Sequence, residues 1–214
     1  MDGTLLDLAF DNYFWRELIP RVIARRRNIT EGRAREHVFE LYADKEGTLD
    51  WYCLDFWGRQ LELDLVELKT ASSQRIRFLP GAREFLQMAR DSGKRLVLVT
   101  NAHQENLNMK KDVAGLTLWI DEFVSSHDIG APKEKRVFWE RLQAGLGFDP
   151  AAALFVDDSQ AVLDAAAAFG IGSVIGIRCP DSRMPGRDTG RHPSIDSIAE
   201  WLSKQTWVPS STAF

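Results

Sequence analysis

The stretch Ala153-Leu154-Phe155-Val156-Asp157-Asp158-Ser159 is the part of this 214-residue chain that decides its fold class. Its first four residues form a continuous apolar run, which is typical of a parallel strand covered on both faces. Residues 95–100 have the same character. A third run, Ser173–Ile177, follows a helix-like stretch at 161–169 that Gly170 terminates. These runs predict strands of a buried parallel sheet.

Helical patterns lie between the strands, at residues 81–92 and 134–144, and a weaker strand is expected at 120–124. In the first helix, Phe85 and Met88 recur at helical spacing after Pro80, a residue that suits the entry of a helix. Strands that alternate with helices predict an α/β fold with a Rossmann-like parallel sheet. Ligands of such a sheet bind outside the carboxyl ends of its strands.

Residues 9–77 differ from this α/β pattern. They contain no strong strand run, show helical periodicity and are rich in aromatic residues. We interpret them as an all-helical insertion whose aromatic side chains mostly form its core. The expected organisation is a core of residues 1–8 and 78–204, the insertion at 9–77, a surface loop at 179–193 and a frayed C-terminal tail at 205–214.

Composition excludes several classes of protein. The formal charge is −4, because 27 basic residues face 31 acidic ones, so nothing favours nucleic acid as a partner. The basic run Arg25-Arg26-Arg27 is interpreted as a solvated helix end. Cys53 and Cys179 lie far apart without metal-ligand neighbours and are expected to be buried apolar residues in a reducing cytoplasm. We find no signal peptide and no run of ~20 apolar residues, so no membrane partner is expected.

Four short polar segments fall where parallel strands should end or where the next turn begins. Each alone has an ordinary explanation, such as a helix N-cap, a turn or a surface cation. Together they suit phosphoryl transfer, in which cations and hydroxyls position a negatively charged group. Adjacent carboxylates hold Mg²⁺, and a further carboxylate can protonate a leaving alkoxide. The segments are Asp2-Gly3-Thr4, Thr100-Asn101, Lys133 and Asp157-Asp158.

This set resembles the four signature motifs of the haloacid dehalogenase superfamily: DxDGT, Thr or Ser after a strand, Lys, and an acidic pair. The resemblance implies that Asp2 is the general acid and then base, and that its backbone carbonyl is a metal ligand. It also implies that Thr100, Asn101 and Lys133 bind the phosphoryl group. Asp158 and Asp157 would hold Mg²⁺, with Asp158 as the direct ligand.

Over nearly its whole length the chain further resembles the bacterial 5′-nucleotidases of that superfamily that act on GMP and IMP and carry a helical cap. The resemblance implies Mg²⁺-dependent hydrolysis of purine nucleoside 5′-monophosphates through an aspartyl-phosphate, with residues 9–77 as the cap. It rests on the strings MDGTLLDLAFDNYFW, LDWYCLDFW, VTNAHQENL, APKE, FVDDSQAVLDAAAAFGI and RHPS.

The first motif departs from the family pattern in one respect. The nucleophilic aspartate should lie two positions before Asp2, which is ahead of Met1. We expect the true start to lie upstream, with a truncated product as the alternative. The 214-residue chain alone is expected to lack phosphatase activity and to be poorly soluble.

Other functions are compatible with the same motifs. One is a different capped phosphatase of the superfamily that acts on a sugar phosphate or resembles a phosphoglucomutase. Another is a catalytically inactive protein that binds a nucleotide. A dehalogenase is disfavoured, because the acidic pair and the Asp-Gly-Thr segment suit a metal-dependent phosphatase.

Overall fold

The computed structural model describes residues 1–204, so the expected tail at 205–214 lies outside the described residues. All strand pairs are parallel, which confirms the α/β fold. One sheet joins β1 (Val97–Thr100) to β2 (Glu122–Ser125), and the other has the order β3-β4-β5. The strands of the second sheet are β3 (Leu154–Asp157), β4 (Ser173–Ile177) and β5 (Ser194–Ile195).

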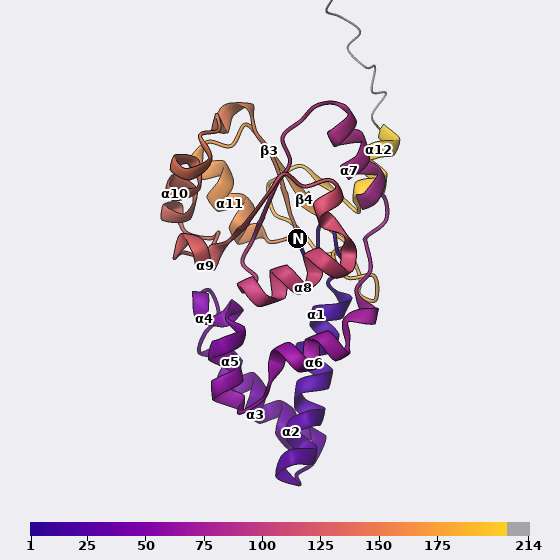
Figure 1. The fold of residues 1–214 in the computed structure, drawn as a ribbon, viewed down its shortest axis with the longest axis vertical. Helices are drawn as coiled ribbons and strands as arrows, with labels where there is room; N and C mark the ends of the chain where they lie inside the picture. Colours follow the sequence, from indigo (N-terminus) through magenta and orange to yellow (C-terminus); the bar gives the residue numbers. More distant parts are fainter. Residues whose placement is uncertain (205–214) are drawn as a thin grey trace, which may run out of the picture.

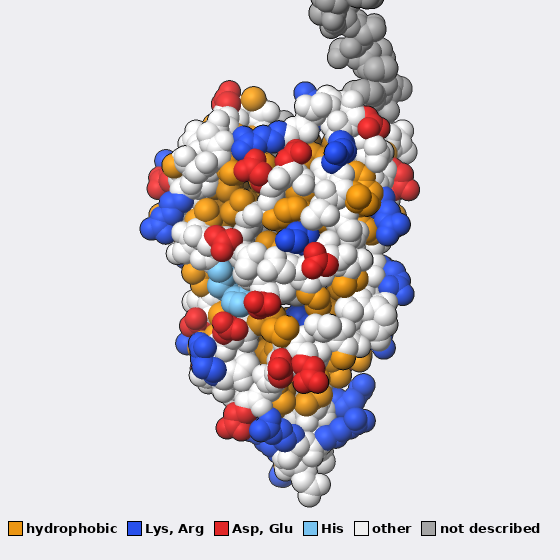
Figure 2. Space-filling view, viewed as in Figure 1, with side chains coloured by type: hydrophobic (Ala, Val, Ile, Leu, Met, Phe, Trp, Pro, Cys, Tyr) orange, Lys and Arg blue, Asp and Glu red, His pale blue; other side chains and the backbone are white. Residues whose placement is uncertain are grey.

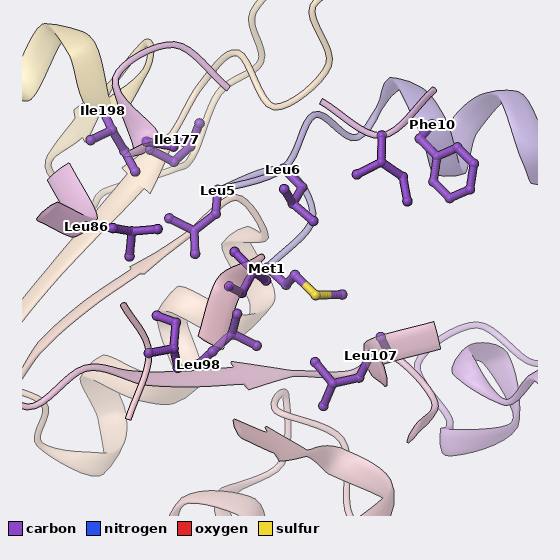
Figure 3. Close-up of a cluster of buried hydrophobic side chains, with 14 of the residues drawn as sticks. Met1, Leu5, Leu6, Phe10, Leu86, Leu98, Leu107, Ile177 and Ile198 are labelled. Atoms are coloured by element: carbon purple, nitrogen blue, oxygen red, sulfur yellow. The ribbon is translucent and has the colours of Figure 1, made fainter. Parts of the chain in front are cut away.

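Within the described residues the parallel strands form two sheets, and residues 1–6 pack beside both. Residues 1–6 fold into a tight turn. The amides of Gly3 and Leu6 donate to the carbonyls of Leu6 and Met1 respectively, so the turn satisfies its own backbone groups. Met1, Leu5 and Leu6 nevertheless pack in one buried cluster with Leu98 of β1 and Ile177 of β4 (Figure 3).

Helices cover both sheets (Figure 1). α7 and α12 pack beside the cluster of Figure 3, whereas α10 and α11 enclose a second core around Trp139 and Phe155. The predicted helices at 81–92 and 134–144 are therefore confirmed with small shifts of their ends. The helices of this part are α7 (Ala82–Asp91), α8 (Gln104–Ala114), α9 (Ser126–Ile129), α10 (Arg136–Leu146), α11 (Gln160–Phe169) and α12 (Ile198–Lys204). Short 3₁₀ turns occupy Ser73–Arg75, Leu116–Leu118 and Pro150–Ala152.

Residues 9–77, here called the cap, are helical as expected and lie together at one end of the molecule (Figure 1). Their own core contains Phe14, Tyr42 and Trp57. Thr30 and Asp64 begin two of the helices by accepting hydrogen bonds from backbone amides three residues on. The elements are α1 (Ala9–Tyr13), a π-helical turn (Phe14–Leu18), α2 (Ile19–Arg27), α3 (Glu31–Ala43), α4 (Leu49–Tyr52), α5 (Leu54–Leu61) and α6 (Leu65–Ala71).

The cap contacts the rest of the molecule partly through histidines, which gather with acidic side chains at its boundary with the sheets (Figure 2). His103 Nε2 lies 3.7 Å from Asp55 Oδ2 of the cap, and the His103 ring packs edge-on against His127. The basic run that ends α2 is exposed, as expected for a solvated helix end.

Two expectations about burial need correction. Cys53 and Cys179 are half-buried, and the Cys53 thiol accepts a hydrogen bond from the Phe56 amide at the start of α5. The loop at 179–193 has no regular structure, as expected, but Asp181 and Thr189 within it are buried. Asp181 accepts a hydrogen bond from Asn12 Nδ2 of α1 at 2.6 Å, and Thr189 lies against Gly176 of β4. None of the helices in residues 1–204 is long and apolar enough to cross a membrane.

Candidate active site

A cleft of about 1080 Å³ lies between the cap and the carboxyl ends of the strands. Side chains from both parts line it, including all six residues predicted from the motifs: Asp2, Thr100, Asn101, Lys133, Asp157 and Asp158. Residues up to 156 positions apart in sequence therefore meet at one site. Their roles in chemistry stay predictions.

The turn at residues 1–6 rests directly on Asp158. Gly3 has a φ of +72°, and a Cβ at this position would lie 2.5 Å from Asp158 Cγ. Only glycine allows both this backbone conformation and this close approach. The turn thereby brings Asp2 to the same end of the cleft as the acidic pair.

Thr100, Asn101 and Lys133 form a connected group. Thr100 ends β1, and its hydroxyl accepts a hydrogen bond from the Ala102 amide at 3.1 Å. Asn101 Oδ1 accepts from the backbone amide of Lys133 at 2.9 Å, and its Nδ2 donates to Glu134. This amide therefore fixes the loop that carries the lysine. The three side chains are buried.

Lys133 and Asp157 form a buried ion pair, with Nζ 2.5 Å from Oδ2. Asp157 Oδ1 also accepts a hydrogen bond from the Ser159 amide at 3.0 Å. Burial alone would raise the pKa of Asp157, but the Lys133 ammonium outweighs burial and holds the pKa below its ordinary value. Asp157 is thus a structural partner of Lys133 as well as a member of the acidic pair.

Asp158 has a different environment. Its carboxylate and its backbone carbonyl accept hydrogen bonds from the half-exposed Arg187. Burial and the neighbouring Asp157 carboxylate raise the pKa of Asp158 to about 6, although Arg187 acts in the opposite direction. The sequence reasoning missed Arg187, because it lies in a loop that was assigned only to the surface.

A second buried network was also missed. Lys110 of α8 donates to Asp2 Oδ1 at 2.6 Å and to Asp11 Oδ2, and Lys69 of α6 donates to Asp11 Oδ1 at 2.7 Å. Both lysine side chains are only 1% exposed. Burial would raise the pKa of Asp11, but the two ammonium groups hold it well below its ordinary value. The only sequence signal was the position of Lys110 three residues after buried Leu107, on the inner face of α8.

The cap side of the cleft is aromatic. Trp15, Phe39, Tyr42, Trp51 and Tyr52 line it, and Tyr42 packs edge-on against both tryptophans. The Tyr52 hydroxyl donates to Glu134 Oε1 at 2.7 Å and so links the cap to the Asn101 group. The cleft therefore has an apolar wall opposite an end that carries buried charges.

The donor set at this end fits Mg²⁺, which prefers carboxylate and carbonyl oxygens and keeps several waters. The close contact at Gly3 places Asp158 against the residue that follows Asp2, and Asp2 and Asp157 line the same cleft. Within residues 1–204 no group of three or more His, Cys, Asp or Glu side chains forms a complete cation cage. A site of few side chains completed by water is what Mg²⁺ commonly uses.

The fold, the strand-end residues and the cap together define a class of hydrolase. The family model of the haloacid dehalogenase-like hydrolases matches residues 1–170. The chain belongs to this family, and the expectation drawn from its motifs is confirmed.

Individual proteins of known name and structure resemble the chain more specifically than the family model does. The chain is 42% identical over 196 residues to the GMP/IMP nucleotidase YrfG of Escherichia coli strain K12, covering 92% of this chain and 88% of that protein. The same values hold for YrfG of Shigella flexneri. Among solved structures, the fold resembles a haloacid dehalogenase phosphatase from Thermococcus onnurineus, with a TM-score of 0.74 at 22% identity, over 95% of this chain and 94% of that one.

Proposed function

We propose that this protein is a Mg²⁺-dependent phosphomonoesterase that hydrolyses purine nucleoside 5′-monophosphates, GMP and IMP, to nucleoside and phosphate. The observation that carries the proposal is a single cleft lined both by the buried Thr100, Asn101 and Lys133 and by aromatic side chains of the cap. The 42% identity to nucleotidases named for GMP and IMP supports the choice of substrate.

The charged end of the cleft would receive the phosphoryl group. The Thr100 hydroxyl and the Lys133 ammonium are buried there and can donate to its oxygens. Because Asn101 holds the Lys133 backbone and Asp157 holds the Lys133 side chain, the ammonium is oriented before substrate arrives. Such preorganisation stabilises the transition state without reorganisation during the reaction.

Proton transfer falls to Asp2. In this family the aspartate two positions ahead of it attacks phosphorus, and the bond from phosphorus to the ribose O5′ breaks. Asp2 gives its proton to the departing O5′ and later takes one from the water that hydrolyses the aspartyl-phosphate. Asp158 and the Asp2 carbonyl would hold Mg²⁺, which supplies positive charge next to the phosphoryl oxygens.

The nucleoside would lie against the cap. Purine rings stack on aromatic side chains, and Trp15, Trp51 and Tyr52 line the cleft. The cleft of about 1080 Å³ is large enough for a nucleotide, since small-molecule sites span roughly 300–1,000 Å³. A sugar phosphate would leave most of this aromatic wall unused.

A substrate panel tests the proposal. Since the family pattern places the nucleophile two positions before Asp2, the assay uses a chain extended upstream to carry an aspartate at that position. We expect phosphate release from GMP and IMP with Mg²⁺ and none in EDTA, with kcat/KM for these nucleotides above that for hexose phosphates. A preference for sugar phosphates would contradict the substrate assignment, and nucleotide binding without turnover would indicate a binding protein.

A further inference from the structure

We propose that Lys110 is a positioning residue that orients the Asp2 carboxyl for proton transfer, and that Asp11 and Lys69 hold Lys110 in place from the cap side. The inference rests on the proposed function and names residues for it that the family motifs do not include.

Lys110 binds one of the two carboxylate oxygens of Asp2. Lys110 Nζ lies 2.6 Å from Oδ1, and no side-chain hydrogen bond to Oδ2 occurs within residues 1–204. A carboxyl anchored through one oxygen keeps the other free to face a substrate. Asp2 lines the cleft and 16% of its side chain is exposed, which leaves a path from the cleft to this carboxyl group. Lys110 thus fixes the direction in which Asp2 can exchange a proton.

The position of Lys110 is itself determined by buried partners. Its side chain is 1% exposed, and its ammonium also binds Asp11 Oδ2 and lies 5.3 Å from the Phe10 ring centroid. Asp11 belongs to α1, where the chain enters the cap, and its other oxygen binds Lys69 of α6. Two ammonium and two carboxylate groups therefore balance in charge at the junction of cap and core.

Stability alone does not account for this network. Removing two lysines and two aspartates from water costs several kcal/mol per ion, so a buried pair gives little net stability compared with packed apolar residues. What such a network does supply is fixed geometry, because each charge has a defined partner. In this network one of the fixed carboxylates is that of Asp2, the group proposed to transfer the proton.

The test compares Lys110→Met with Lys111→Met in the upstream-extended enzyme. Lys111 is the next residue of α8 and contacts Asn108 and Phe123, away from the cleft. We expect Lys110→Met to lower kcat for GMP by about 10- to 100-fold, the rate equivalent of one charge-assisted hydrogen bond, with KM little changed. Lys111→Met should keep the parent kcat. p-Nitrophenyl phosphate, whose leaving group needs little protonation, should show a smaller loss.

A double-mutant cycle separates positioning from a general structural effect. If Lys110 acts through Asp2, Lys110→Met should cost nothing further in an Asp2→Asn background, measured with p-nitrophenyl phosphate. Independent, additive losses would overturn the proposal. If Lys110→Met does not fold, the double variant Lys110→Met/Asp11→Asn is used, because it keeps the buried charges balanced. Its kcat is compared with that of Asp11→Asn alone. Equal kcat values for these two variants would also contradict the positioning role of Lys110.

The two proposals fail in different ways. If the parent enzyme does not turn over GMP or IMP, the substrate assignment is wrong, and the cycle can still be read with p-nitrophenyl phosphate. If the parent hydrolyses GMP and Lys110→Met matches Lys111→Met in kcat, only the positioning role is wrong.

Discussion

Asp157 and Asp158 are adjacent in sequence, yet their carboxylates meet different partners. Asp157 is committed to Lys133 in a buried pair, whereas Asp158 lies against the Gly3 turn and pairs with a half-exposed arginine. A strand directs alternate side chains to opposite sides, and the chain turns into α11 directly after β3. We therefore expect the two carboxylates to have separable roles.

Asp158→Asn should weaken Mg²⁺ binding with little loss of fold stability. Replacing a residue that only supports a metal ligand typically weakens metal binding by roughly 10–100-fold. Because Asp158 is the expected direct ligand, we expect the Mg²⁺ concentration for half-maximal activity to rise by at least this factor. Asp157→Asn should instead lower the free energy of unfolding by about 3–5 kcal/mol, because it leaves the Lys133 ammonium buried without its partner. Magnesium titrations and urea unfolding of both variants distinguish these effects. Equal changes in both measurements would contradict the separation.

Thr100, Asn101 and the acidic pair could be located from sequence because they lie at the ends of strands that the apolar runs reveal, whereas Asp2 and Lys133 were identified through the resemblance to the family motifs. Lys110 and Arg187 could not be located in either way. Their partners Asp2 and Asp158 lie 108 and 29 positions away, and nothing local in the sequence marks such pairings. Only the folded arrangement of cap, α8 and the 179–193 loop brings these charges together.

At the scale of elements, periodicity predicted what is long and regular. β1, β3 and β4 follow from continuous apolar runs, and α7 and α10 from helical spacing. β5 has two residues, and the π-helical turn in the cap is one turn long, so neither is long enough to produce a period. The turn at residues 1–6 is held by hydrogen bonds between its own backbone groups, which local patterns did not indicate.

Packing between elements can be tested at Gly81, which precedes α7. It has a φ of +79°, and a Cβ there would lie 2.4 Å from the Ala199 backbone nitrogen in α12. Gly81→Ala should therefore cost more than the ~1–2 kcal/mol of left-handed backbone strain alone, because α12 must also move. Gly93→Ala is the matched control, since its φ is +68° with no atom near the added Cβ. Urea unfolding that gives equal losses for the two variants would show that α12 does not approach this closely.

At the scale of the whole molecule, the site is complete only where cap and core meet. The core supplies Thr100, Lys133 and the acidic pair, and the cap supplies the aromatic wall. The buried Lys69–Asp11 pair, the Tyr52–Glu134 hydrogen bond and the His103–Asp55 contact all cross or border this junction. A ligand that reaches both sides should therefore stabilise both parts of the fold at once.

This reasoning predicts an order of ligand effects on the melting temperature. With Mg²⁺ present and GMP at about 100 times its Kd, mass action adds about 2.7 kcal/mol, which corresponds to a rise of about 5–10 °C for a chain of this size. The Asp2→Asn variant is used so that GMP survives the scan. Inorganic phosphate reaches only the charged end and guanosine only the aromatic wall, so each at the same concentration should raise the temperature less than GMP does. If phosphate alone reproduced the full shift, the cap would contribute nothing to binding, and the aromatic wall would be only the core of the cap.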